Sequence, residues 1–196
     1  MEAWKDQVRK IAEEMTGAPQ IASGDIPDIE IYMDQLTTYL DKRLGFYNRE
    51  EGTPFVTRSM VNNYSKAGLL PPTEAKRYSQ VHIMMLTLIC QLKRLFTIQD
   101  LGRLLAPAAE EKEGAQDLYR HFLTAQREAF AQTPELAERL LSALEGGEEG
   151  SEAGARAALV TQLAVRAQRD LLLAERILDS MPVPEKKARK EKKKKQ

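Results

Sequence analysis

The residues with the clearest chemical meaning lie between Thr57 and Gly68, where polar side chains recur on one side of a predicted helix. Thr57 can cap the start of this helix and Gly68 can end it. A rotation of about 100° per residue sorts the side chains between them into two faces. The apolar face consists of Met60, Val61, Tyr64 and Ala67, whereas the polar face carries Arg58, Ser59, Asn62 and Lys66, with Asn63 at its edge.

Asparagine is the informative residue type on the polar face. It is a poor helix former, so two adjacent asparagines, Asn62 and Asn63, need an explanation on an exposed helix. An asparagine in the major groove can pair with adenine through two hydrogen bonds, and the absence of acids from this face would let it approach DNA. One alternative stays open, in which both asparagines simply lie on a solvated surface.

A turn after this helix carries the second group of candidate residues. The proline pair at 71–72 imposes an extended exit from the helix. Lys76 and Arg77 then stand beside Tyr78. Two cations next to a phenolic hydroxyl suit contacts to phosphate, which position a protein on DNA without reading its sequence. Ser79 can cap the following helix, whose free N-terminal amides would also favour a phosphate.

Signatures of catalysis, cofactor binding and metal binding are missing from the sequence. It has no glycine-rich phosphate loop, no cysteine pair, and only two histidines, His82 and His121, which stand far apart. The single Cys90 falls in an apolar stretch, where we expect a small buried residue. We therefore expect a protein that is not an enzyme and that uses no cofactor or metal.

The same segment resembles a bacterial family known as domain of unknown function 1836. The resemblance is carried by Asn62-Asn63-Tyr64-x-Lys66-x-Gly68-Leu69-Leu70-Pro71-Pro72, Lys76-Arg77-Tyr78-Ser79, His82-Ile83, Leu92-Lys93 and Ile98-Gln99-Asp100, with Asp25-Ile26-Pro27-Asp28 and Tyr32-Met33-Asp34-Gln35 upstream. It covers roughly residues 25 to 105. This family brings no established biochemical activity with it.

A more distant resemblance implies a mechanism. The order of Tyr64, Gly68-Leu69-Leu70, a proline, the turn tyrosine, a leucine-rich helix and a Phe-Thr-Ile-x-Asp-Leu turn is similar to the DNA-binding domain of mercury-resistance-type (MerR-type) regulators. This resemblance implies a winged helix-turn-helix core containing Val61 and Tyr64. Asn62 and Lys76 stand where those regulators carry arginines, the wing is shorter, and residues 45–53 form an added segment, so no sequence preference is carried over.

The remaining sequence predicts an all-α protein whose helices position these residues. Apolar spacing predicts further helices at 4–15, 28–44, 80–96, 98–105, 114–132, 134–145 and 155–181. The helix at 80–96 is apolar on nearly every side and is expected to be the buried centre. A capping box at Thr97 and Asp100 opens the next helix, which is expected to end before Pro107. We expect no strand of ordinary length.

These elements divide the chain into six predicted segments. They are an N-terminal amphipathic helix and linker (1–24), a winged helix-turn-helix domain (25–105), a helical hairpin (106–145), a flexible linker (146–154), a C-terminal helix (155–181) and a disordered basic tail (182–196). The C-terminal helix places Val160, Leu163, Ala167, Leu171, Ala174, Leu178 and Met181 on one seam. This seam is typical of a coiled coil and favours a homodimer, although packing on its own domain stays open as the alternative.

Charge is unevenly distributed, although the formal net charge is zero. Residues 56–95 hold six cations and one acid, a net charge of +5, whereas residues 1–55 and 106–180 carry net charges of −5 and −6. We expect these acidic flanks to lie away from a bound phosphate backbone. The tail at 185–196 carries +6 and is either an additional attraction for polyanions or a solvated segment that aids solubility.

The sequence therefore favours a bacterial transcription regulator whose partner is double-stranded DNA. The predicted DNA contacts are Arg58, Ser59, Asn62, Asn63, Lys66, Lys76, Arg77 and Tyr78. The alternative is a non-catalytic protein-interaction module built on the same winged-helix core. We expect a cytoplasmic protein, because no apolar run is long enough to span a membrane and the N-terminus lacks the plan of a signal peptide. No small-molecule ligand is evident.

Overall fold

Helices make up most of the fold in a computed structural model that describes residues 3–50, 52–110, 112–145 and 151–182. They are α1 (Ala3–Thr16), α2 (Met33–Leu44), α3 (Arg58–Lys66), α4 (Gln80–Leu92), α5 (Ile98–Glu110), α6 (Lys112–Ala131), α7 (Thr133–Glu145) and α8 (Glu152–Ser180), with two short 3-10 helices, η1 (Ser23–Asp25) and η2 (Gly45–Tyr47). The predicted all-α class is confirmed. None of the helices in the described ranges combines the length and the apolar character needed to cross a membrane.

Helix α4 is the centre of the larger of two apolar cores. Every residue from His82 to Cys90 is buried, because a helix that is apolar on all sides is stable only when other elements surround it. Helices α2, α5 and α6 pack against it. The buried side chains that they contribute include Leu36, Leu40, Leu101, Leu105 and Tyr119. This core draws on residues from Ile21 to Leu123 and so includes the first half of α6.

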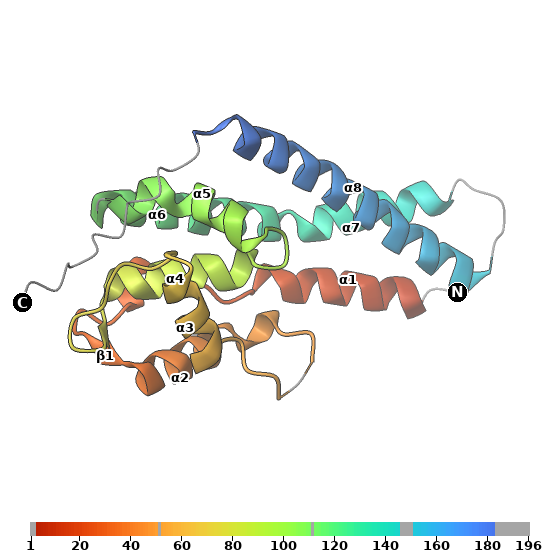
Figure 1. Cartoon of the computed structure of the whole chain (residues 1–196). Coiled ribbons are helices and arrows are strands. Elements are labelled where there is room, and N and C mark those ends of the chain that lie inside the picture. Colours follow the sequence, from red (N-terminus) through yellow and green to blue (C-terminus); the bar gives the residue numbers. More distant parts are fainter. Residues whose placement is uncertain (1–2, 51, 111, 146–150, 183–196) are drawn as a thin grey trace, which may run out of the picture.

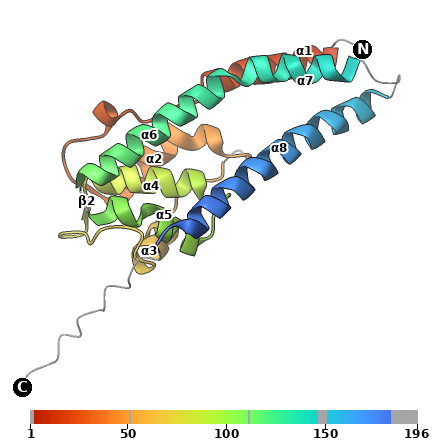
Figure 2. The same ribbon diagram turned by 90° about the horizontal axis from the view of Figure 1, so that it is seen from above.

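A second, smaller core joins α1 to α7 and to the start of α8. Helices α1 and α7 lie side by side in both views (Figures 1 and 2). The buried cluster consists of Trp4, Leu140, Leu141 and Leu159. At the surface, Arg9 on α1 pairs with Glu138 on α7, with 2.6 Å between Nε and Oε1. These contacts tie the beginning of the chain to its last third.

Two short strands form a sheet beside the larger core. Strand β1 (Ile31–Tyr32) pairs antiparallel with β2 (Arg77–Tyr78), with Ile31 opposite Tyr78 and Tyr32 opposite Arg77. Successive side chains of a strand point to opposite faces, so the first pair lies in the core and the second pair is exposed. The sheet fixes the turn before α4 against the segment before α2.

The predicted start of the helix at 28–44 is wrong, because the sheet draws residues 31–32 into an extended conformation. Helix α2 begins only at Met33, and Ile29 lies outside any helix with 68% of its surface exposed. The side chain of Gln35 accepts a hydrogen bond from the backbone N–H of Tyr32 at 2.9 Å and closes the first helical turn there. The sheet therefore sets where α2 begins.

Two further helix ends differ from the prediction. Helix α4 ends at Leu92, and α5 continues through Pro107 to Glu110. A proline removes one helical hydrogen bond, and burial of Leu105 and Ala108 on the same helix offsets that loss. Ala67 and Leu95, predicted as apolar contacts, are exposed because each lies beyond the last residue of its helix.

Helix α8 contacts the rest of the chain near its two ends. Leu159 belongs to the smaller core beside α7, and Leu178 is buried near the contact with α5. Between them Val160, Leu163, Val165, Leu172 and Leu173 are exposed. Figure 1 shows α8 on the side of α5 and α6 that is opposite to α2 and α3. Of the predicted linker, residues 152–154 belong to α8 and 146–150 lie outside the described residues, as does the tail from 183 onward.

Candidate nucleic-acid interface

Helix α3 presents the polar face that its sequence predicts. The Thr57 hydroxyl caps it by accepting a hydrogen bond from the Met60 N–H at 3.2 Å. Gly68 follows the helix with a φ of +77°, a left-handed conformation that glycine adopts at little cost. Val61 and Tyr64 are buried and anchor the helix. The exposed residues of the helix are Arg58, Ser59, Asn62, Asn63, Ser65 and Lys66.

The turn after α3 ends in a tight hairpin with Ala75 and Lys76 at its tip. Both residues have positive φ, 47° and 58° respectively, and the Arg77 N–H donates to the Glu74 carbonyl at 2.9 Å. Turns with two left-handed central residues match the twist of antiparallel strands. The exposed Lys76 side chain therefore stands at the end of a short, defined projection.

Tyr78 lies in the core and not with the two cations that precede it. Only 6% of its surface is exposed. Its ring meets the His82 ring edge-on, with 5.5 Å between centroids, and burial raises the pKa of Tyr78. The alternation of β2 that exposes Arg77 turns the Tyr78 ring inward, so the ring has a packing role. The phosphate contact of its hydroxyl stays a prediction.

His82 holds the two ends of the turn together. Its Nδ1 accepts a hydrogen bond from the backbone N–H of Ser79 at 3.1 Å. Its Nε2 lies 3.1 Å from the carbonyl of Pro71, and since Nδ1 is an acceptor, Nε2 is the donor. Burial lowers the pKa of His82 and favours this neutral form. Ser79 is the N-cap of α4, as predicted, and His82 is its partner in the capping box.

The segment 30–34 lies against both α3 and the turn. Asp34 pairs with Arg58 at the start of α3, with 2.5 Å between Oδ1 and Nη2, and Glu30 pairs with Arg77, with 3.7 Å between Oε2 and Nε. One short segment thus reaches both groups of candidate residues, and in both views α3 and the turn lie at the same end of the molecule (Figures 1 and 2). The expectation that the acidic flank lies away from this face is wrong for Glu30 and Asp34, because β1 pairs with β2.

These ion pairs reduce the charge of the face. Its cations are Arg58, Lys66, Lys76 and Arg77, and its acids are Glu30, Asp34 and Glu74. Lys93 is directed elsewhere, since its ammonium donates to the Phe55 carbonyl at 3.3 Å and lies over the Phe55 ring. The excess of positive charge at the face is therefore smaller than the +5 of residues 56–95 suggests.

Tyr32 joins the candidate face although the sequence did not predict it. It is 59% exposed and stands opposite Arg77 in the sheet, so both side chains belong to the exposed face of the sheet. The only local signal is the alternation of buried Ile31 with exposed Tyr32. Two residues are too few to distinguish a strand from the start of a helix by periodicity.

Metal-binding and thiol groups are the remaining candidates for reactive chemistry. No group of His, Cys, Asp and Glu side chains suited to a metal ion occurs in the part of the chain that the structure describes. Cys90 is buried in α4, and burial raises the pKa of its thiol to about 12. The thiol is thus protonated and enclosed, as the sequence predicts for a small apolar residue.

The sequence model of a family described as "Domain of unknown function (DUF1836)" matches residues 21–122, more than half of the chain. The chain belongs to the DUF1836 family. The DUF1836 region covers nearly the same residues as the larger core, which runs from Ile21 to Leu123, so α2, α3, the turn and α4 all lie within it. The comparison with curated proteins gave no match, and neither did the comparison with solved structures.

Proposed function

We propose that this DUF1836 protein is a transcription regulator that binds duplex DNA through α3 and the turn at 71–78. In this proposal α2, α3, the sheet and the turn form a winged helix-turn-helix with α3 as its recognition helix and Lys76 at the tip of its wing. The similarity of the sequence to MerR-type regulators supports this arrangement. One observation carries most of the weight: α3 exposes only polar and basic residues beside a projecting basic turn.

The exposed residues divide into two roles by their chemistry. Lys76 and Arg77 are positioned for phosphates, which fix the protein on the duplex. Asn62 lies on the α3 face opposite Val61 and Tyr64, where a side-chain amide can pair with the edge of an adenine in the major groove. Arg58 forms an ion pair with Asp34, so a phosphate must compete with the Asp34 carboxylate for the Arg58 guanidinium.

The first experiment measures retention of mixed genomic duplexes by the full-length protein at several salt concentrations. Binding through phosphates weakens steeply as salt rises, and loss of one phosphate contact reduces the salt slope by about one unit. We expect this reduction for both Lys76→Ala and Arg77→Ala on every DNA sequence. Arg139→Ala, which removes an exposed cation from α7, is the matched control and should leave the slope unchanged.

The second experiment separates recognition from positioning. Asn62→Ala should cost about 1 to 3 kcal/mol of binding free energy on a selected site and much less on a scrambled one. Equal losses on both DNAs would show that Asn62 reads no base. No detectable retention of any duplex at low salt would overturn the whole proposal.

A protein-interaction module is the second candidate function. The pairing of Arg58 and Arg77 with Asp34 and Glu30 favours it, because it lowers the charge that attracts DNA. A protein partner would bind the same face with a much weaker salt dependence than the phosphate contacts of a duplex give. The salt series therefore distinguishes the two functions.

A homodimer through α8 is part of the proposal. The structure divides the predicted seam, since Leu178 is buried near α5 whereas Val160, Leu163 and Ala167 remain exposed. Because α8 lies on the side of α5 and α6 opposite to α3 (Figure 1), a second copy could pair there without covering α3. Dimeric regulators of this kind bind two DNA half-sites.

A further inference from the structure

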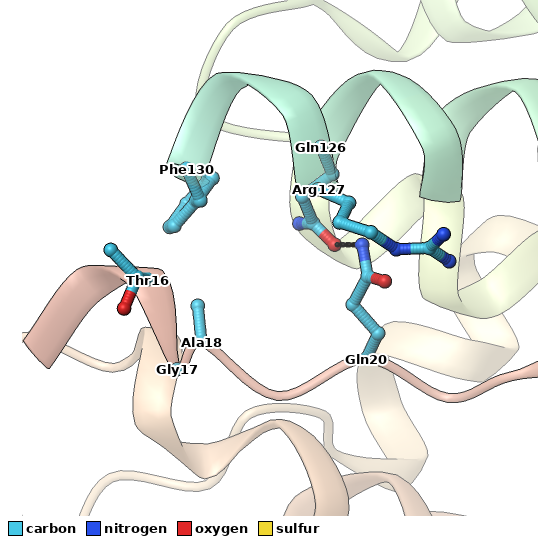
Figure 3. Close-up of a pocket in the computed structure, with 7 residues that line it drawn as sticks. All are labelled: Thr16, Gly17, Ala18, Gln20, Gln126, Arg127 and Phe130. Atoms are coloured by element: carbon cyan, nitrogen blue, oxygen red, sulfur yellow. Dashed lines mark hydrogen bonds between the residues drawn. The ribbon is translucent and has the colours of Figure 1, made fainter. Parts of the chain in front are cut away.

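An open cleft of about 300 Å³ lies between the end of α1 and the second half of α6, away from the candidate DNA face. Its lining residues are Thr16, Gly17, Ala18, Gln20, Gln126, Arg127 and Phe130, which Figure 3 shows. The volume is at the lower end of the range of ligand pockets. Helix α1, which belongs to the smaller core, borders this cleft. Gln20, which directly precedes the DUF1836 region, borders it as well.

An amide pair fixes the polar wall of the cleft. The side-chain nitrogen of Gln20 donates to the Leu123 carbonyl at 2.8 Å and to the Gln126 Oε1 at 3.0 Å. Because Oε1 of Gln126 accepts this bond, the amide nitrogen of Gln126 points the other way, toward Phe130 and Thr16 (Figure 3). This nitrogen makes no hydrogen bond with the residues that the structure describes, and the Arg127 guanidinium has no ion pair among them.

The opposite wall is apolar and is held by contacts of its own. The Phe130 ring packs edge-on against Tyr47, with 6.3 Å between centroids. The Thr16 hydroxyl donates to the Glu13 carbonyl at 2.7 Å, so it is occupied within α1. Ala18 adds a methyl group beside them (Figure 3). The cleft therefore combines a free donor on Gln126 that faces a fixed aromatic surface with the exposed Arg127 guanidinium, which extends past Gln20 on the far side of the amide pair (Figure 3).

We propose that this cleft binds a small organic carboxylate with a flat apolar body. The body would pack on Phe130 and Ala18, and the carboxylate would accept a hydrogen bond from the Gln126 amide. The exposed Arg127 side chain would swing from its position beyond Gln20 to pair with the same carboxylate. Charge-assisted hydrogen bonds of this kind are the stronger ones. The C-terminal ends of α1 and α6 both add partial negative charge near the cleft, so binding of an anion depends on the full charge of Arg127.

Aromatic contacts connect the cleft with the start of α3. Phe130 meets Tyr47, and Tyr47 in turn meets Phe55 with 6.5 Å between centroids. Phe55 precedes the α3 cap, Thr57, by two residues. The Tyr47 hydroxyl also donates to the Pro19 carbonyl at 2.9 Å, beside Gln20. A ligand that moves Phe130 therefore acts on the support of α3, and an effect on DNA affinity, which rests on the proposed function, is the expected consequence.

The test uses benzoate as the probe, titrated into the full-length protein and followed by NMR shifts of the Gln20, Gln126 and Arg127 amides. We expect saturable binding with a Kd on the order of 1 mM. Arg127→Gln and Phe130→Leu should each weaken it about tenfold or more. Arg120→Gln, an exposed arginine on the same helix but outside the cleft, is the matched control and should change nothing.

Acetate and benzylamine test the two parts of the ligand, its apolar body and its negative charge, one at a time. Acetate lacks the ring and should bind far more weakly than benzoate, whereas benzylamine reverses the charge and should not saturate. Absence of saturable benzoate binding, tighter binding of benzylamine, or an equal loss in Arg120→Gln would each overturn the proposal. Retained binding in Arg127→Gln would do the same, because the carboxylate would then bind elsewhere.

A separate measurement examines the connection to α3. DNA retention is compared with and without saturating benzoate, in the natural protein and in Phe55→Leu, which removes the ring that Tyr47 contacts on the α3 side and leaves the cleft lining unchanged. We expect benzoate to change retention in the natural protein and not in the variant, while both bind benzoate. Benzoate binding without any change in retention would overturn the connection but leave the site. If the protein binds benzoate but retains no DNA, the proposed function is refuted and the carboxylate site is not.

Discussion

The tip of the turn stores backbone strain at the residues that would meet DNA. Ala75 and Lys76 both adopt left-handed conformations, which cost a non-glycine residue on the order of 1 kcal/mol each. Asparagine accepts this conformation better than alanine and is favoured at the first central position of such turns. We infer that the turn is kept in shape by the sheet, by His82 and by the buried Tyr78.

Ala75→Asn should therefore stabilise the protein. We expect the free energy of unfolding to rise by about 0.5 to 1 kcal/mol, since strain is relieved and Lys76 keeps its place. Chemical denaturation measures this change. The control is Ala164→Asn, the same substitution at an exposed position in α8, which should lower stability by about 0.6 kcal/mol because asparagine is a poor helix former. A loss of stability in both variants would contradict the strain at the turn.

His82 should make stability depend on pH. Burial lowers the pKa of the folded-state imidazole, although the Pro71 carbonyl and Glu30 oppose that shift. Below the ordinary histidine pKa of about 6.5 the unfolded chain binds a proton that the folded chain does not. Stability is therefore highest above pH 6.5 and falls as the pH decreases toward the lower folded-state pKa, with a slope of at most about 1.4 kcal/mol per pH unit for one site.

Urea denaturation between pH 5 and 8 checks this dependence. His82→Gln removes the titrating group while an amide can still accept from Ser79, so its stability should vary less over this range. His121→Gln, at an exposed position on α6, should keep the dependence of the natural protein. If both variants behave alike, His82 is not the group that titrates.

At the scale of elements, the end of α8 depends on one arginine of α5. Arg103 donates to the Asp179 carboxylate and carbonyl, each at 3.2 Å, and to the Met181 carbonyl at 3.3 Å. The carbonyls at the end of a helix have no partners within it, so an outside donor stabilises that end. The Arg103 guanidinium thus holds the C-terminal end of α8 against α5.

Arg103→Ala should release this end of α8 without unfolding the rest. We expect local opening to become easier by about 1 to 2 kcal/mol, so amide exchange of residues 177–180 should speed up by roughly tenfold or more. The smaller core around Trp4 should be unaffected. Arg176→Ala removes an exposed cation from α8 itself and should leave exchange unchanged. Unchanged exchange in Arg103→Ala would show that other contacts hold this end.

At the scale of the whole molecule, the proposed dimer places its interface on α8. Val160 and Leu163 lie on the exposed part of the seam, whereas Val165 and Leu172 face a different side of the helix. Exposed apolar residues that form one contiguous surface are typical of a protein interface, and Val160 and Leu163 stand one helical turn apart. The dimer predicted from the sequence stays a prediction, and of its seam the structure leaves Val160, Leu163 and Ala167 exposed.

Replacing both Val160 and Leu163 by glutamate should dissociate the dimer, because two like charges on each copy would face each other across the seam. Sedimentation at high micromolar protein concentration measures the mass. Glutamates at Val165 and Leu172 are the matched control and should leave the dimer intact. Dissociation by the Val165 and Leu172 glutamates alone would show that the interface lies on the other side of α8. A natural protein that is already monomeric would refute the dimer.

The sequence by itself determined the features that depend on one or two helical turns. The cap at Thr57, the stop at Gly68, the two faces of α3 and the capping box at Thr97 all follow from residues three or four positions apart. Continuous apolar character likewise identified α4 as the buried centre. These interactions form within the element, so their pattern is visible in the chain.

Only the tertiary structure decided the composition of the candidate face. The pairing of Ile31 with Tyr78 joins residues that are far apart in the sequence. It shortens α2, turns Tyr78 inward, exposes Tyr32, and brings Glu30 and Asp34 against the basic residues. Such long-range pairing depends on closing a loop and on how the surrounding core packs. A strand of two residues has too little periodicity for the sequence to predict it.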